Sequence, residues 1–126
     1  MREVIMVFLG GGVGSICRYG IGKWINRASI PTFPYSTLLV NLLACLAIGM
    51  LAGSQAQKDL FSPAIKYLFI IGFCGGFSTF SAFSIESMKL WQDGNLTAFF
   101  IYILISIIGC ILLTFVGFFV AQKFFQ

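Results

Sequence analysis

The sequence has little charge, and the charges that it has are far apart. Only 10% of its 126 residues are charged, whereas a soluble domain carries roughly 25%. Four uncharged stretches divide the chain, at residues 4–17, 28–57, 67–85 and 94–122. With 59% hydrophobic residues, the chain has too few polar side chains to surround a soluble core. We therefore predict that most of this protein is surrounded by lipid.

Histidine is absent, which removes the commonest general base and a favoured metal ligand. The four cysteines, Cys17, Cys45, Cys74 and Cys110, include no CxxC pair, so the sequence predicts neither a metal site nor a disulfide framework. We interpret them as small, buried and mostly inert side chains. Without a histidine, a plausible nucleophile–base pair or a soluble module, the sequence does not predict an enzyme.

Long polar connections are also missing. A membrane-spanning helix needs about 20 mostly apolar residues, and we predict four spans, at residues 4–25, 35–54, 65–88 and 96–121. The longest connection is then 55–64. The sequence therefore predicts an all-α integral membrane protein in which residues 1–126 form a single four-span domain.

The basic residues are few and nearly balanced between the two sides of the predicted membrane domain. The net charge is +4, but no basic cluster could follow a phosphate backbone, so we predict no nucleic-acid partner. The side with both termini carries Arg2, Lys58, Lys66 and Lys123, and the other carries Lys23, Arg27 and Lys89, with Arg18 nearest to it. Because the Lys/Arg bias sets orientation, two alternatives stay open: one orientation, or both orientations in an antiparallel homodimer. Four spans hardly enclose a pathway alone, so we expect an oligomer.

The stretch GFCGGFSTFSAFS, residues 72–84, carries glycines and hydroxyls through an apolar span. Gly75 and Gly76 are poor helix formers, and Ser78 and Thr79 compete for backbone hydrogen bonds. Together they favour a helix break at mid-membrane. Such a break is tolerated where it is buried in protein or faces water, and its carbonyls can coordinate a cation. A continuous helix whose glycines only allow close packing is the alternative.

Aromatic rings lie beside hydroxyls in the same stretch. Phe80 and Phe83 are three residues apart, next to Ser81 and Ser84. The edge of an aromatic ring is electropositive, and conduction needs weak or multiple binding sites. Ring edges and hydroxyls therefore suit a small anion without a fixed positive charge, although most aromatic stripes serve packing.

Other polar residues repeat at the helical spacing of four. Thr37 and Asn41 share one face of span two, and span four carries Tyr102, Ser106, Cys110 and Thr114 along one face. The Asn41 amide either joins helices by a hydrogen bond or lines a pore. Three hydroxyls on one face favour a wetted path.

Span one combines small residues with a deep arginine. Gly10 and Gly14 form a small-residue pair that permits close helix approach. Arg18 follows on the same face and must reach the interface, pair or face a cavity. We favour a structural role for Arg18 over a direct role in permeation.

Three segments resemble the Fluc/CrcB family of fluoride channels. They are G-G-x-x-G-x-x-x-R from Gly10 to Arg18, S-T-L-L-V-N from Ser36 to Asn41, and G-F-C-G-G-F-S-T-F-S-A-F-S-x-E from Gly72 to Glu86. The similarity extends over the whole chain and is most specific in the third segment. Ala82 and Cys110 depart from it, each replacing a hydroxyl that relatives often have.

The resemblance implies a passive, fluoride-selective channel that exports cytoplasmic fluoride across the inner (plasma) membrane. It implies a dual-topology antiparallel homodimer with two pores and a structural sodium ion at its centre. The sodium would bind the carbonyls of Gly75 and Ser78 from both subunits, and Arg18 would have an entry or structural role. The implied fluoride path consists of Thr37, Asn41, Phe80, Ser81, Phe83, Ser84, Glu86, Tyr102, Ser106 and Thr114.

Two other classes compete with this interpretation. A proton-coupled exporter of the small-multidrug-resistance type needs a carboxylate deep in the membrane, but Glu3 and Glu86 both lie toward span ends. A membrane scaffold without a selective pore would leave Asn41 and the hydroxyls unexplained.

Overall fold

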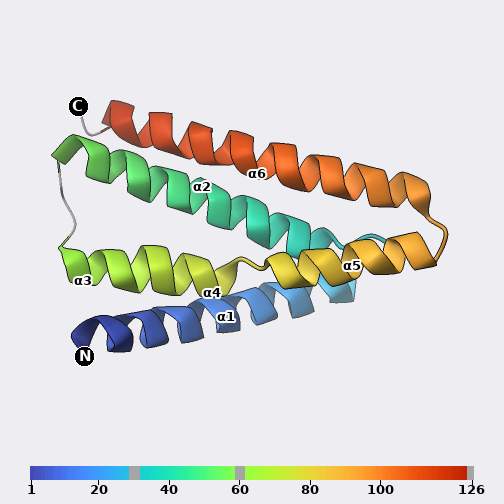
Figure 1. The fold of residues 1–126 in the computed structure, drawn as a ribbon, viewed down its shortest axis with the longest axis horizontal. Helices are drawn as coiled ribbons and strands as arrows, with labels where there is room; N and C mark the ends of the chain where they lie inside the picture. The colour runs from blue at the N-terminus through green and yellow to red at the C-terminus, as the bar shows by residue number, and fades with distance from the viewer. Residues whose placement is uncertain (29–31, 59–61, 125–126) are drawn as a thin grey trace.

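The computed structural model describes residues 1–28, 32–58 and 62–124, and Figure 1 shows that helices dominate them. Helix α1 covers Arg2–Ala28, α2 covers Tyr35–Lys58 and α6 covers Leu96–Phe124. The third segment consists of α3 (Pro63–Lys66), the π-helix η1 (Tyr67–Cys74), α4 (Gly75–Phe77) and α5 (Phe80–Gln92).

Four helical stretches are long and apolar enough to cross a membrane. They are Arg2–Arg27, Tyr35–Ser54, Pro63–Gln92 and Leu96–Phe124. The predicted all-α membrane fold with four spans is therefore confirmed, and this is a multi-pass membrane protein. Each stretch begins or ends within a few residues of its predicted bounds. Residues 59–61 of the predicted 55–64 connection lie outside the described residues.

The helices form two pairs, in which α2 packs along α6, and α1 packs along η1 and α4. The start of α1, the end of α2, the start of α3 and the end of α6 lie at one end of the molecule, and the end of α1, the start of α2 and the α5–α6 turn lie at the other (Figure 1). The helix ends that flank the predicted 55–64 connection therefore lie at the same end as the start of α1 and the end of α6, as the sequence predicted.

Glycines bring the first pair into backbone contact. A Cβ atom at Gly10 would overlap the carbonyl oxygen of Leu68, and one at Gly14 would overlap that of Phe73. The small-residue pair of span one thus lies where α1 meets η1, because only a missing side chain permits such close approach.

The second pair uses the same device, which the sequence analysis did not single out. Added Cβ atoms at Gly49, Gly53 and Gly117 would overlap the carbonyl oxygens of Thr114, Phe118 and Leu46 respectively. Both helices contribute to this contact, since two glycines of α2 and one glycine of α6 lie against the backbone of the other helix. This close approach sets the distance between α2 and α6.

The third span is broken at its middle. Ser78 and Thr79 have extended backbone, with ψ angles of 160° and 118°. Helix α5 then restarts with Thr79 as its N-cap, because the Thr79 hydroxyl accepts the Ala82 N–H at 3.2 Å. Of the two alternatives that the sequence left open, the structure has the broken helix.

A tight turn returns the chain from α5 to α6. Gly94 has a φ of 72°, the left-handed conformation that glycine adopts most easily after a helix end. Asn95 then caps α6, and its side-chain oxygen accepts the Ala98 N–H at 3.2 Å. The turn places the first half of α6 beside α5, so Tyr102 and Ser106 come near the break.

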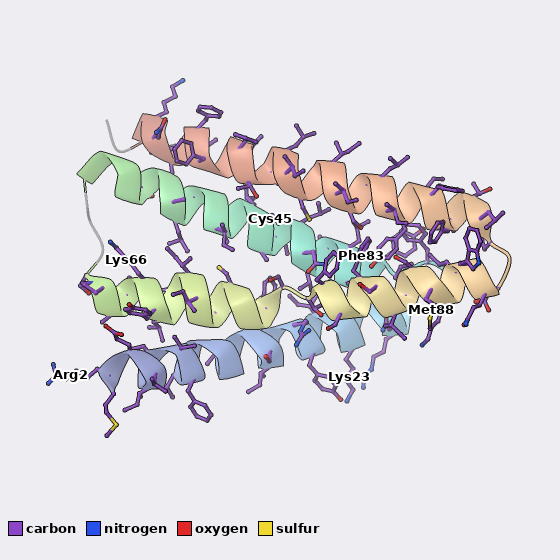
Figure 2. All side chains as sticks on the ribbon, in the orientation of Figure 1. Arg2, Lys23, Cys45, Lys66, Phe83 and Met88 are labelled. Atoms are coloured by element: carbon purple, nitrogen blue, oxygen red, sulfur yellow. The ribbon has the colours of Figure 1, made fainter. Side chains whose placement is uncertain are left out.

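The buried core is small and lies beside the break. Val40, Ala44 and Phe77 form its centre, with Phe73 packed against it. Most other large apolar side chains point outward, as Figure 2 shows along the outer faces of the helices. An apolar exterior is expected of helices whose surroundings are lipid.

Candidate functional site

Asn41 holds the break in place by pairing with the backbone of Thr79. Its Oδ1 accepts the Thr79 N–H at 2.8 Å, and its Nδ2 donates to the Thr79 carbonyl at 3.1 Å. The amide thus replaces the helical partners that the extended residue lost, as buried backbone groups require. An amide carries two N–H donors, and this pairing uses one of them. The predicted interhelical and pore-facing roles of Asn41 are therefore compatible.

The break redirects two N–H groups away from their helical acceptors. In a continuous α-helix, the N–H groups of Thr79 and Ala82 would bond to the carbonyls of Gly75 and Ser78. Instead they donate to Asn41 Oδ1 and to the Thr79 hydroxyl. The two carbonyls therefore lose their regular donors, and nothing lies within 4 Å of a Cβ atom added at Gly75.

These carbonyls are suitable cation ligands. Carbonyls of unwound helices coordinate sodium in other membrane proteins. In residues 1–28, 32–58 and 62–124, no group of three or more His, Cys, Asp or Glu is placed to hold a metal ion. The chemistry of the break therefore fits a hard cation bound by main-chain oxygens.

The Glu86 carboxylate is held by two hydroxyls from two other helices. Thr37 Oγ1 donates to Glu86 Oε1, and the Tyr102 hydroxyl donates to Oε2, both at 2.8 Å. Thr37 is buried, and Tyr102 is 0% exposed. Hydrogen bonds to a charged acceptor are stronger than neutral ones, so this cluster ties α2, α5 and α6 together.

A row of aromatic rings leads from Tyr102 to the surface. The Phe83 ring lies 5.1 Å from the Tyr102 ring and 5.4 Å from the Phe80 ring, centroid to centroid. Figure 2 labels Phe83, which lies on the side of α5 that faces α2 and α6. Phe80 is 78% exposed, so the row ends at the outer face of α5.

Two cavities lie near Glu86 and these rings. The first, of about 550 Å³, is lined by Ser36, Glu86, Lys89 and Asp93 among others and lies toward the α5–α6 turn. The second, of about 320 Å³, lies toward the break and is lined by Asn41, Phe80, Phe83, Ser106 and other residues. Glu86 lines the first cavity and Phe83 lines the second, and Tyr102 contacts both residues.

Ser106 has an unusual position in the second cavity. It is only 7% exposed. Within the described part of the chain, its hydroxyl is the single buried side-chain N or O atom that has no hydrogen-bond partner. Such a group is costly to bury, and here it borders a space that a hydrogen-bond acceptor could occupy.

Arg18 lines a third cavity, of about 270 Å³, together with Ser15, Thr37 and Thr79. This cavity lies where α1 meets α2 and the break, and Thr37, which donates to Glu86, lines it together with Arg18. Ser15, which the sequence analysis did not select, donates to the Gly76 carbonyl at 3.3 Å. The sequence could have indicated Ser15, since it is the one hydroxyl residue in the uncharged stretch 4–17.

The residues that line the three cavities do not include Ser81, Ser84 and Thr114 of the predicted fluoride path. Ser84 is exposed and donates to the Phe80 carbonyl at 3.0 Å. Ser81 is exposed and lies 3.3 Å from the Thr79 hydroxyl, oxygen to oxygen. Thr114 donates to the Cys110 carbonyl at 2.9 Å and is not among the residues that line the three cavities. Spacing alone could not show that these hydroxyls bond to their own helices.

Together, the fold and the site define a four-span membrane protein with a broken third helix and uncharged donors along a cavity. Residues 5–118 match the model of the family described as CrcB-like protein, Camphor Resistance (CrcB). The chain therefore belongs to the CrcB-like family. This agrees with the resemblance that the sequence motifs carry.

Curated relatives are similar over most of their length, and each bears the name fluoride-specific ion channel FluC. The one from Azobacteroides pseudotrichonymphae is 42% identical over 111 residues, covering 87% of this chain and 89% of that protein. The one from Flavobacterium psychrophilum is 37% identical over 123 residues, covering 98% and 99%. The one from Rhizobium etli is 42% identical over 107 residues, covering 85% and 86%. These proteins are named as ion channels and not as enzymes, in line with the sequence analysis.

Proposed function

We propose that this protein is a passive, fluoride-selective channel that exports cytoplasmic fluoride and relieves its toxicity. Family membership and the names of the relatives support this class. The observation that carries it is the second cavity, where the buried Ser106 hydroxyl lacks a partner beside Asn41 and the two phenylalanines. An anion would complete the hydrogen bonding of that hydroxyl.

The donors of this cavity are polar but uncharged. A hydroxyl, an amide N–H and the electropositive ring edges of Phe80 and Phe83 attract an anion weakly. Conduction needs binding that permits both entry and exit. A cavity of this kind therefore suits transit of a small anion more than its storage.

The Glu86 cluster marks the step between the two cavities. Thr37 and Tyr102 have one O–H donor each, and both are engaged by the carboxylate. A passing fluoride ion must compete with Glu86 for these donors. We propose that exchange of these hydrogen bonds transfers the anion from the first cavity to the second.

We propose that two copies assemble as an antiparallel, dual-topology homodimer with two pores. In one chain, the Phe80 ring is largely exposed, and Gly75 is exposed as well, with nothing within 4 Å of an added Cβ atom. A second copy would cover the ring and complete each path. The nearly equal numbers of basic residues on the two sides are compatible with both orientations.

We further propose that a structural sodium ion binds where the two breaks meet. The carbonyls of Gly75 and Ser78 would hold it, because their helical donors are redirected. Two carbonyls from one chain are a partial set for a small cation, so the symmetric pair from the second copy is needed. When bound, the ion would offset the carbonyl dipoles and join the two breaks.

The proposed location is the inner (plasma) membrane, where a passive exporter of cytoplasmic fluoride must act. A proton-coupled exporter is not favoured, because both oxygens of Glu86 accept hydrogen bonds from hydroxyls and the relatives are named as channels.

The test is efflux from liposomes that contain the purified protein, with fluoride and chloride measured in parallel. Fluoride that leaves quickly while chloride is retained supports the proposal. Retention of both anions by correctly folded protein would contradict it. Proton-linked uptake of cationic drugs, measured in the same liposomes, tests the alternative.

A further inference from the structure

Two free thiols meet in the second cavity, and the proposed channel does not use them. Cys45 of α2 and Cys110 of α6 both line this cavity. Both are half-buried free cysteines. Figure 2 marks the position of Cys45 along α2. The two thiols thus come from different helices, far apart in sequence, to one place.

The fold holds this pair together. Gly49 lies one helical turn beyond Cys45, and Thr114 lies one turn beyond Cys110. The backbones touch at that level, because a Cβ atom at Gly49 would overlap the Thr114 carbonyl. Backbone contact one turn away limits how far the thiols can separate.

The pair also lies next to the donors of the proposed fluoride path. Asn41 precedes Cys45 by one turn, and Ser106 precedes Cys110 by one turn, on the same faces of α2 and α6. One turn is about 5.4 Å. An ion bound by the two sulfurs would therefore occupy the cavity beside both donors.

The chemistry of two thiols selects a particular kind of ligand. Thiolate sulfur prefers soft metal ions. A structural zinc ion needs four protein ligands, and no third His, Cys, Asp or Glu is grouped with this pair in the described parts of the chain. The remaining candidates are soft metal ions that bind two ligands in a linear arrangement.

The net charge of the metal–dithiolate complex restricts the candidate metal ions further. Metal binding requires thiolates, so each thiol releases a proton. A divalent ion with two thiolates forms a neutral complex, whereas a monovalent ion leaves one negative charge. Because a net charge is costly in an apolar environment, the divalent ion is favoured.

We propose that Cys45 and Cys110 form a binding site for a soft divalent metal ion of the mercuric type, held as a two-coordinate dithiolate. Two metal–sulfur bonds form, two S–H bonds break, and two protons pass to water without any change of oxidation state. The bound ion would block the second cavity, a consequence that rests on the proposed channel function.

Binding is tested with mercuric chloride on the purified protein, by measuring the mercury retained after gel filtration in a monothiol buffer. The variant Cys17→Ser/Cys74→Ser keeps the pair and should retain one mercuric ion per chain, with both remaining thiols protected from a thiol reagent. Within that variant, a further Cys45→Ser or Cys110→Ser replacement should each abolish mercury retention, and Cys45→Ala and Cys110→Ala serve as second replacements. Retention in either single variant would overturn the proposal.

Block is tested by fluoride efflux from liposomes. Mercuric ion should reduce efflux of the Cys17→Ser/Cys74→Ser variant to that of protein-free liposomes, and a dithiol should restore it. The Cys45→Ser/Cys110→Ser variant should be insensitive. Mercury retained without loss of efflux would overturn the blocking role. Because retention is measured without flux, a failure of the metal site is distinguishable from a failure of the channel function.

Discussion

The two halves of the third span contact the rest of the chain in different ways. Before the break, η1 and α4 lie along α1, and glycines bring backbone against backbone. After the break, α5 has fewer neighbours and is joined to α2 and α6 through Glu86, Tyr102 and the Phe83 ring. Packing therefore positions the first half, and side-chain hydrogen bonds and rings position the second. Of the two halves, only the second carries the rings of the proposed anion path, Phe80 and Phe83.

The largest expected effect comes from removing the side chain that joins these halves. Asn41→Leu leaves the Thr79 N–H and carbonyl without partners, at about 1–3 kcal/mol for each buried group. We expect a marked loss of thermal stability in detergent together with loss of fluoride efflux.

Asn41→Asp separates the two roles of this residue. Its carboxylate can still accept the Thr79 N–H, but it places negative charge on the proposed path and faces the Thr79 carbonyl. We expect folded protein with suppressed efflux, measured in liposomes beside the parent chain. Efflux equal to that of the parent would place Asn41 outside the path.

The next largest loss of stability is expected where α1 packs against the first half of the third span. Gly14→Ala adds a methyl group that overlaps the Phe73 carbonyl, and overpacking of this kind costs about 1–3 kcal/mol. Gly12→Ala is the matched control, since nothing lies within 4 Å of an added Cβ there. Thermal unfolding should distinguish the two variants, and equal stability would show that α1 can move away from η1.

A loss of stability of similar size is expected at Glu86. Tyr102→Phe keeps the buried ring and removes one hydrogen bond to the carboxylate, which is worth about 1.5–3 kcal/mol for a charged acceptor. Efflux should fall as well, because one of the two exchangeable donors is lost. Thr37→Val removes the other donor, so a change in stability without a change in efflux in both variants would contradict the proposed transfer step.

The smallest change in stability is expected at the end of the aromatic row. Phe80 is largely exposed in one chain, so Phe80→Ile should unfold at nearly the parent temperature. Phe83→Ile loses contact with two rings, at about 0.5–1.5 kcal/mol for each aromatic pair. Both variants should conduct less fluoride, and normal efflux in both would remove the rings from the path.

Much of the fold could be predicted from local patterns. The uncharged stretches predicted four spans, and Gly75, Gly76, Ser78 and Thr79 favoured the break that the structure has. The Gly10–Gly14 pair predicted a close contact for α1. These features depend on composition and on spacing along one helix, which the sequence displays directly.

Contacts between helices could not be read in the same way. Spacing placed Ser84 and Thr114 on polar faces, but both hydroxyls donate to carbonyls of their own helices. Spacing also placed Cys45 and Cys110 on separate spans, with no sign that they meet. Whether a hydroxyl faces a cavity, a neighbour or its own backbone depends on rotation and separation of helices, which periodicity does not specify.

The sequence by itself determined that this protein is surrounded by lipid and how many times it can cross a membrane. It also determined where the helix propensity of the third span is lowest. Charge spacing and intrinsic helix propensity suffice for these features, because both act locally along the chain. Only the tertiary structure decided that Asn41 pairs with Thr79, that Glu86 binds two hydroxyls, and that Ser106 is left without a partner. Each of these outcomes needs groups from different helices at hydrogen-bonding distance, and glycine contacts between the helices set that distance.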